Sequence, residues 1–185
     1  MKAIIKVTAL LIAVGFGATG FAAEALDAPV QAKVDAKLKV IQGWAANSVV
    51  VDAVKAQNAT PPADVASMTQ DKWKALTVLD PVVRGFAKNP TAEYIKSVKD
   101  DTVSEAFVSS ADGTKVAFLS KPSNWSHKGK AKHDDPMAGK TWQGTPEVDE
   151  STGAKQVQVA VPVLDGDKPI GSLVVGLNLT KLTGN

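Results

Sequence analysis

Cysteine is absent from this chain of 185 residues. Its absence excludes disulfide bonds, thiol catalysis, a lipid-bearing cysteine and covalent attachment of c-type haem. The sequence also lacks a Gly-x-Ser-x-Gly nucleophile motif, a phosphate-binding P-loop, a dinucleotide-binding fingerprint and a paired-carboxylate signature. We therefore expect a protein that is not an enzyme and that uses no cofactor.

Long hydrophobic runs are missing as well, apart from a short one near the N-terminus. Residues 1–22 begin with a basic stretch, continue with an apolar run and end in small residues, which is the layout of a secretory signal peptide. The run is shorter than the ~20 apolar residues that span a membrane. We expect export to the periplasm, with cleavage after Ala22, Ala23 or Ala25, and a single domain over 23–185 without a membrane span.

The exported domain also lacks a net charge. The full sequence has 21 basic and 19 acidic residues, and two of the lysines, Lys2 and Lys6, lie in the leader. Without them the domain carries 19 residues of each sign. A neutral domain gives no reason to expect nucleic acid or an anionic membrane surface as a partner.

A long amphipathic helix is predicted over residues 27–58. Apolar residues recur along it at three- and four-residue spacing, which is typical of a helix with one buried face. Asp27 is placed to cap this helix, and Thr60-Pro61-Pro62 to end it. Two short helices should follow, one carrying Trp73 as a core residue and one beginning at Asn89-Pro90.

Strands are expected within residues 104–182. The range 156–179 should be a hairpin that turns at Asp165-Gly166-Asp167, because its valines and leucines alternate with other residues. An earlier hairpin turns at Asp112-Gly113, and Trp142-Gln143 adds an edge strand. These elements predict an α+β fold in which the long helix and the short helices cover one face of a roughly five-stranded antiparallel sheet.

The segment 121–145 separates the two hairpins and shows no apolar periodicity. It contains both histidines of the chain and two of its four tryptophans. An irregular segment of this length inside a compact domain is more often functional than incidental.

Five stretches, in this order and spacing, resemble the Cache family of sensor domains, also called PDC domains, which are PAS-like extracytoplasmic modules of bacterial chemoreceptors and sensor kinases. They are spread along the chain after residue 52: Ala53 to Asn58, Asn89 to Ile95, Phe107 to Gly113, Pro146 to Gly153, and Val161 to Leu179.

The resemblance implies a PAS-like Cache fold that binds a small molecule between the central sheet and the segment 121–145, in the service of signal transduction. Cache domains usually continue into a membrane helix and a signalling domain. This chain ends a few residues after its last predicted strand, so we expect no output domain of its own and a membrane-bound sensor as partner. The amino-acid-binding subgroup has an aspartate for the ligand amine where this chain has Asn178, which disfavours an amine.

Histidine and lysine side chains in the segment supply the cationic donors that a carboxylate needs, and tryptophans can wall a small-ligand pocket. We therefore expect an organic anion as ligand. The candidate ligand-binding residues, the last of them taken from its match to an acidic position of the family, are Trp125, His127, Lys128, His133, Lys140, Trp142 and Asp149.

Other interpretations stay open. Both tryptophans fit a structural role better than a ligand-facing one, and the segment also fits a solvated basic loop. The histidines with Asp134 and Asp135 could hold a metal, but three lysines between the histidines repel a cation, so we expect no metal. The main alternative function is an interaction protein with no small ligand, whose long helix pairs with itself or with a membrane sensor.

Overall fold

The computed structural model describes residues 25–148 and 154–184, and within these ranges six strands form one antiparallel sheet. The expected signal peptide at 1–22 and the candidate Asp149 lie outside the described residues. The strand order is β2-β1-β6-β5-β3, and β4 also pairs with β5. The bounds are β1 Val103–Ser110, β2 Lys115–Phe118, β3 Trp142–Gln143, β4 Glu147–Val148, β5 Lys155–Asp165 and β6 Lys168–Asn178.

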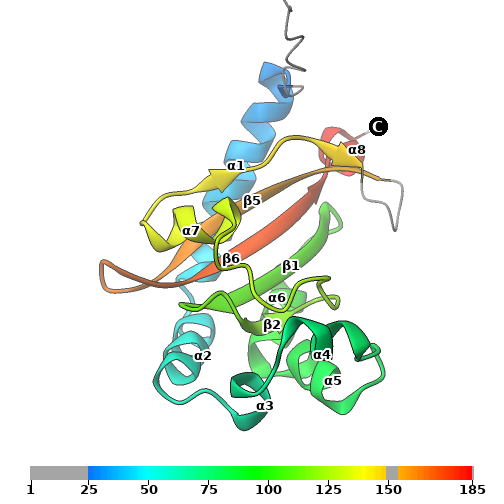
Figure 1. Ribbon diagram of the computed structural model, residues 1–185. Helices are drawn as coiled ribbons and strands as arrows, with labels where there is room; N and C mark the ends of the chain where they lie inside the picture. Colours follow the sequence, from blue (N-terminus) through cyan, green and yellow to red (C-terminus); the bar gives the residue numbers. More distant parts are fainter. Residues whose placement is uncertain (1–24, 149–153, 185) are drawn as a thin grey trace, which may run out of the picture.

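The hairpin of β5 and β6 forms the centre of this sheet, as predicted (Figure 1). It turns at Gly166, whose φ of 60° is a conformation that glycine adopts without steric cost. The two strands pair in register from Gln156 opposite Asn178 to Val163 opposite Gly171. The expected edge strand at Trp142-Gln143 is also confirmed, since it pairs with β5.

The helical regions differ from the sequence prediction in two ways. The long helix expected over 27–58 is two helices, because Asn47 leaves the helical conformation and its side chain caps the second helix by accepting from the Val49 amide. Helices α3 and α5 are additional. Within the described residues the bounds are α1 Ala28–Ala45, α2 Ser48–Ala59, α3 Ala63–Ala66, α4 Gln70–Ala75, α5 Pro81–Lys88, α6 Pro90–Val98, α7 Ala131–Met137 and α8 Leu179–Thr183.

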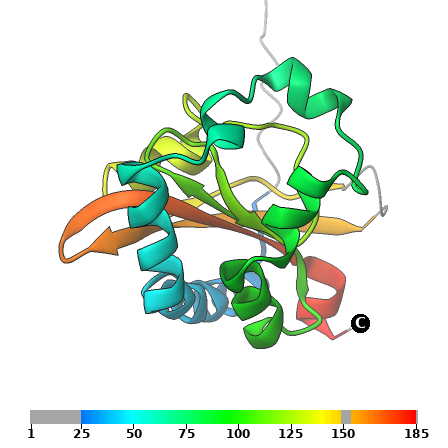
Figure 2. The ribbon, with the colours of Figure 1, turned by 90° about the horizontal axis from the view of Figure 1, so that it is seen from below.

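Both faces of the sheet are covered, so the expectation of helices on one face only was wrong (Figure 2). One face, here called the helix face, packs Val108, Val159 and Val175 under α1, α2 and α6. The other, here called the loop face, packs Phe107 and Val174 under α3, α4, α5 and the segment that follows β2. The central strands can serve both cores because they are apolar at successive positions, and not only at alternate ones.

The segment 121–145 is also more ordered than its sequence suggests, because it contains α7 and β3. Helix α7 packs against β5 and β6 on the loop face. Its last turn contains Pro136, which is buried. No helix in the described part of the chain is long and apolar enough to cross a membrane.

Candidate functional site

A buried lysine is the central feature of the loop face. Lys115, the first residue of β2, has 0% exposed surface. Its ammonium group lies 2.6 Å from Nδ1 of His127, 3.3 Å from the hydroxyl of Ser109 and 3.4 Å from the carbonyl oxygen of Gly113. All three are neutral acceptors. No carboxylate within the described residues bonds to this ammonium, so its positive charge has hydrogen bonds but no counter-ion.

The surroundings of Lys115 disfavour its charged form. Burial removes the water that stabilises an ammonium, and Lys132 repels it, so the pKa of Lys115 falls from 10.5 to about 7. The ring of Phe107, whose centroid is 4.7 Å from the ammonium, offers the electron-rich face of an aromatic group as partial compensation. Lys115 therefore changes charge near neutral pH, where an exposed lysine stays protonated.

His127 contacts both the lysine and the aromatic ring. Its imidazole stacks on Phe107, with ring centroids 4.7 Å apart and an angle of 18° between the planes. Burial, and after it the charge of Lys115, lowers the pKa of His127 from 6.5 to about 3. The imidazole is thus neutral at pH 7, and its Nδ1 accepts a hydrogen bond from the ammonium.

His133 is the second buried histidine and lies on α7. Its Nε2 is 3.2 Å from the carbonyl oxygen of Ala111, and its Nδ1 is 2.8 Å from the hydroxyl of Ser172 on β6. A carbonyl oxygen only accepts, so Nε2 carries the proton and the Ser172 hydroxyl donates to Nδ1. Burial lowers the pKa of His133, and the hydrogen bond to Ala111 opposes this effect only in part. The lowered pKa keeps the His133 ring neutral at pH 7, like that of His127.

The turn between β1 and β2 holds the loop that carries His127. The His127 amide donates to the carbonyl of Gly113 at 3.0 Å, and the Ser126 hydroxyl donates to the carbonyl of Asp112 at 2.9 Å. Gly113 has a φ of 74°, and a Cβ at this position would lie 2.4 Å from the Lys128 nitrogen. Glycine is therefore required at this turn for the loop to reach the buried lysine.

Lys132, which lies on α7, has acidic neighbours, in contrast to Lys115 on β2. The Lys132 ammonium donates to the side-chain carbonyl of Gln158, and the amide of Gln158 donates to Glu105. Burial lowers the pKa of Lys132, while the charges of Glu105 and Glu147 raise it. The surroundings compensate the charge of Lys132, whereas Lys115 is a buried cation without a counter-ion among residues 25–148 and 154–184.

The structure places two of the predicted ligand-binding residues, His127 and His133, at this site. Trp125 instead packs among the aromatic rings of the loop face, 5.1 Å from the ring centroid of Trp73. Trp142 is half-buried at the edge of the same core.

The remaining predicted residues lie elsewhere. Lys128 and Lys140 are exposed, and Lys128 forms an ion pair with Asp112 at 3.3 Å in which both side chains face solvent. Asp149 lies outside the described residues. Their role in ligand binding stays a prediction.

Asn178, the last residue of β6, has a structural role. Its side-chain oxygen accepts from the Lys181 amide at 3.0 Å and thereby caps α8.

Sequence reasoning missed Lys115, Ser109 and Ser172. In a strand that alternates regularly, Lys115 and Phe118 face opposite sides. The pairing of β1 with β2 is irregular, however: Phe107 lies opposite Phe118, Val108 opposite Ala117 and Ser109 opposite Lys115. The extra residue in β2 turns Lys115 onto the loop face. No signal in the sequence marks this irregularity.

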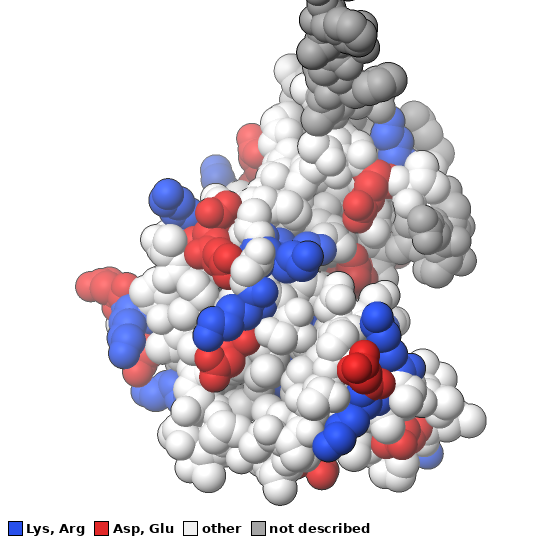
Figure 3. Space-filling view, viewed as in Figure 1, with Lys and Arg blue, Asp and Glu red and all other residues white. Residues whose placement is uncertain are grey.

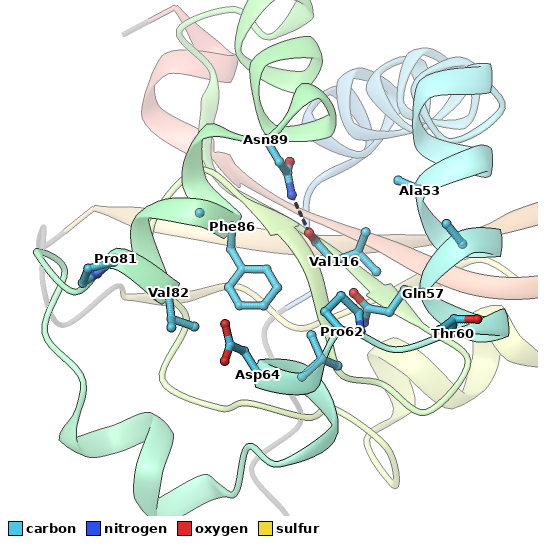
Figure 4. A pocket seen from close by; sticks show the side chains of 13 residues that line it. Ala53, Gln57, Thr60, Pro62, Asp64, Pro81, Val82, Phe86, Asn89 and Val116 are labelled. Carbon is cyan, nitrogen blue, oxygen red and sulfur yellow. Dashed lines mark hydrogen bonds between the residues drawn. The ribbon is translucent and has the colours of Figure 1, made fainter.

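A separate cavity of about 490 Å³ lies between α2, α3 and α5, beside the outer edge of β2 (Figure 4). Its walls are mostly apolar, and they include Phe86 and Val116. The outer edge of β2 is covered by amide side chains, since Gln57 donates to the carbonyl of Lys115 and Asn89 to that of Val116. Sequence reasoning did not anticipate this cavity.

Charges of both signs are mixed on the one face of the described residues that Figure 3 draws. The full chain has a formal net charge of only +2. Recognition of an anion would therefore depend on the buried cation more than on a surface field.

No protein family model matches the chain, and no curated protein sequence matches it. Several solved structures resemble it. One is the ligand-binding domain of the Pseudomonas aeruginosa amino acid chemoreceptor PctC in complex with GABA, at 15% identity and a TM-score of 0.48. Others are the sensor domain of the V. cholerae histidine kinase DctB (15%, 0.47) and the E. coli DcuS sensor domain (12%, 0.49).

Each alignment covers 84% of this chain, and respectively 58%, 54% and 95% of the other chain. The chain thus spans little more than half the length of the first two. All three of these solved structures are ligand-binding or sensor domains. Because these TM-scores are below 0.5, the ligands of the three proteins are not transferred to this chain. Its ligand and partner are proposed below from its own residues.

Proposed function

We propose that the chain is a Cache-type sensor module of the periplasm that binds a small organic anion, such as a carboxylate, at the loop face. The observation that carries this proposal is the buried Lys115, whose ammonium bonds to three neutral acceptors and to no acid within the described residues. A buried charge without a counter-ion costs free energy, and a carboxylate ligand supplies the missing negative charge. The motif pattern of the sequence supports the same class of protein.

The neighbours of Lys115 suit a carboxylate that also carries a hydroxyl or keto group. His127 and His133 provide neutral imidazoles, and Ser109 and Ser172 provide hydroxyl groups, all of them buried. Hydroxyl and imidazole groups can donate hydrogen bonds to a polar ligand or accept them from it, whereas the lysine supplies the positive charge. The ligand reaches the lysine by displacing the covering segment, because Lys115 has no exposed surface.

Ligand binding is tested by thermal unfolding of the chain without residues 1–22 at pH 6.5. Mono-, di- and hydroxycarboxylates are compared with amines and neutral alcohols of similar size. A carboxylate at 100 times its Kd should add about 2.7 kcal/mol of stability, which corresponds to about 5–10 °C in a domain of this size. Equal shifts with the amines, or no shift with any carboxylate, would contradict the proposal.

The pH dependence of binding in the same experiment identifies the lysine. Lys115 is protonated below its pKa of about 7, and a bound carboxylate raises that pKa. The affinity should therefore be constant below pH 7 and fall as the pH rises above it, roughly 10- to 100-fold by pH 9. An exposed lysine, with a pKa near 10.4, would give the same affinity at pH 6.5 and at pH 9. A flat profile would remove Lys115 from the site.

One observation favours the alternative function, an interaction protein that acts through its N-terminal helix. Ala32, Ala36, Val40 and Gly43 recur along α1 at helical spacing and are exposed, and Val40 is 50% exposed. Such a face permits close approach of a second helix.

If this face pairs with itself, the protein should sediment as a dimer without added ligand, and Ala36→Glu should weaken dimerisation at least tenfold. Ala75→Glu, which makes the same change of residue and charge at an exposed position of α4, is the matched control. Monomers at about 100 µM, or equal effects of the two variants, would rule out self-pairing through this face.

A further inference from the structure

The cavity beside β2 is lined mainly by apolar residues, with one charged residue among them. Of its 13 lining residues, none is a lysine, arginine or histidine, and one, Asp64 on α3, carries a negative charge. The other walls are largely the side chains and ring carbons of alanine, valine, proline and phenylalanine. Its volume of about 490 Å³ lies within the range of about 300–1,000 Å³ that is usual for small-molecule sites.

The amide side chains that line the cavity offer acceptors and keep few donors free. The amide nitrogen of Gln57 donates to the hydroxyl of Thr114 and to the carbonyl of Lys115, at 3.1 and 3.2 Å. The amide of Asn89 donates to Val116, and its oxygen accepts from the Ala92 amide. The polar group that Gln57 retains is thus its carbonyl oxygen, and Asp64 adds a carboxylate that Figure 4 shows at the cavity.

We propose that this cavity is a second binding site, which takes an organic ammonium ion with an apolar body. The ammonium would donate to the Asp64 carboxylate and to the Gln57 oxygen, and the ring of Phe86 would lie against the body of the ligand. The absence of cationic side chains from the lining disfavours an anion, because an anion here would meet the Asp64 carboxylate without compensation. The site is therefore opposite in charge to the one at Lys115.

The proposal is tested by calorimetric titration at pH 7 and low salt with three probes that share a phenyl body: 2-phenylethylammonium, 2-phenylethanol and phenylacetate. We expect the ammonium ion to bind at least fivefold more tightly than the alcohol, and phenylacetate to bind most weakly at this site. Asp64→Asn should weaken the ammonium ion five- to tenfold, as expected for a partly solvated ion pair. Asp71→Asn, which removes an exposed carboxylate from the neighbouring α4, should leave binding unchanged.

A second variant tests the cavity without removing its charge. Gly85 lines the cavity, and a Cβ at this position meets no atom within 4 Å. Gly85→Leu should fill the space and abolish binding of the ammonium ion, while it favours the helix. Lys115→Met should leave this binding unchanged, which separates the proposal from the carboxylate site. Tighter binding of phenylacetate that Gly85→Leu abolishes, an unaltered affinity in Asp64→Asn, or no binding of the ammonium ion at 10 mM would overturn the assignment.

Discussion

Replacement of Lys115 by methionine is expected to stabilise the ligand-free protein and to abolish carboxylate binding. Methionine fills a similar volume with apolar atoms, so the variant avoids burial of an ammonium that has only neutral partners. The hydrogen bonds to His127 and Ser109 are lost, which offsets part of the gain. We expect the free energy of unfolding at pH 6.5, measured in urea, to rise by about 1–2 kcal/mol.

The pH dependence of this gain is a stricter test. Between pH 7 and 10.5 the unfolded chain binds a proton at Lys115 that the folded chain has released, so the natural protein becomes more stable as the pH rises through this window. The increase amounts to about 1.4 kcal/mol per pH unit. The Lys115→Met variant gains no such stability, so its advantage should disappear between about pH 8 and 8.5 and be reversed by pH 9. An advantage that stays constant between pH 6.5 and 9 would show that the lysine is not charged when buried.

The control for this prediction is Lys55→Met. Lys55 lies on α2, its side chain is about half exposed, and its ion pair with Asp165 is solvated. Exposed pairs of this kind contribute about 0–1 kcal/mol, so the control should change stability little and should retain carboxylate binding. Loss of carboxylate binding in both variants would indicate that the overall positive charge attracts the ligand, and not a specific site at Lys115.

Replacement of Trp73 by alanine is expected to cost about 3–5 kcal/mol of stability. The indole has 0% exposed surface, and its ring makes edge contacts with Phe86 and Phe118. Its nitrogen donates to the carbonyl of Pro122 at 2.7 Å, which fixes α4 to the start of the segment that covers Lys115. The substitution removes a large apolar area and leaves the Pro122 carbonyl without its donor. Urea unfolding measures the resulting loss in the free energy of unfolding.

Two further variants separate these contributions. Trp73→Phe keeps an aromatic ring and loses the bond to Pro122, so it should cost about 1–2 kcal/mol. Trp142→Ala removes a half-buried tryptophan at the rim of the same core and should cost less than Trp73→Ala. A cost below 1.5 kcal/mol for Trp73→Ala would contradict the central position of this residue in the loop-face core.

The prediction of the β5–β6 hairpin succeeded because its signal is local. Val157, Val159 and Val161 alternate along one strand, and an Asp-Gly-Asp turn specifies the reversal. The start of α6 was predictable for the same reason, since Asn89 caps the helix and Pro90 occupies its first turn. The break between α1 and α2 was missed because valines on both sides continue the helical periodicity, and only the capping conformation of Asn47 interrupts it.

The candidate site was predictable only in part. The composition of the segment 121–145 indicated His127 and His133, because histidines concentrated in an irregular segment are unusual. The same composition also indicated Trp125, which instead belongs to the loop-face core. In the sequence, the exposed Lys128 and Lys140 are as good candidates for binding an anion as the buried Lys115 is. The residue type alone does not indicate which lysine is buried.

The sequence by itself determined the class of the fold, the central hairpin and the segment that carries the two histidines, because these depend on periodicity and on turn chemistry within a few residues. Only the tertiary structure decided that both faces of the sheet are buried, that α7 lies over the loop face, and that Lys115 points into it. The physical reason is the irregular pairing of β1 with β2, a contact between strands that turns one lysine from the helix face to the loop face. The charge that defines the site therefore depends on a strand register, which a single strand does not encode.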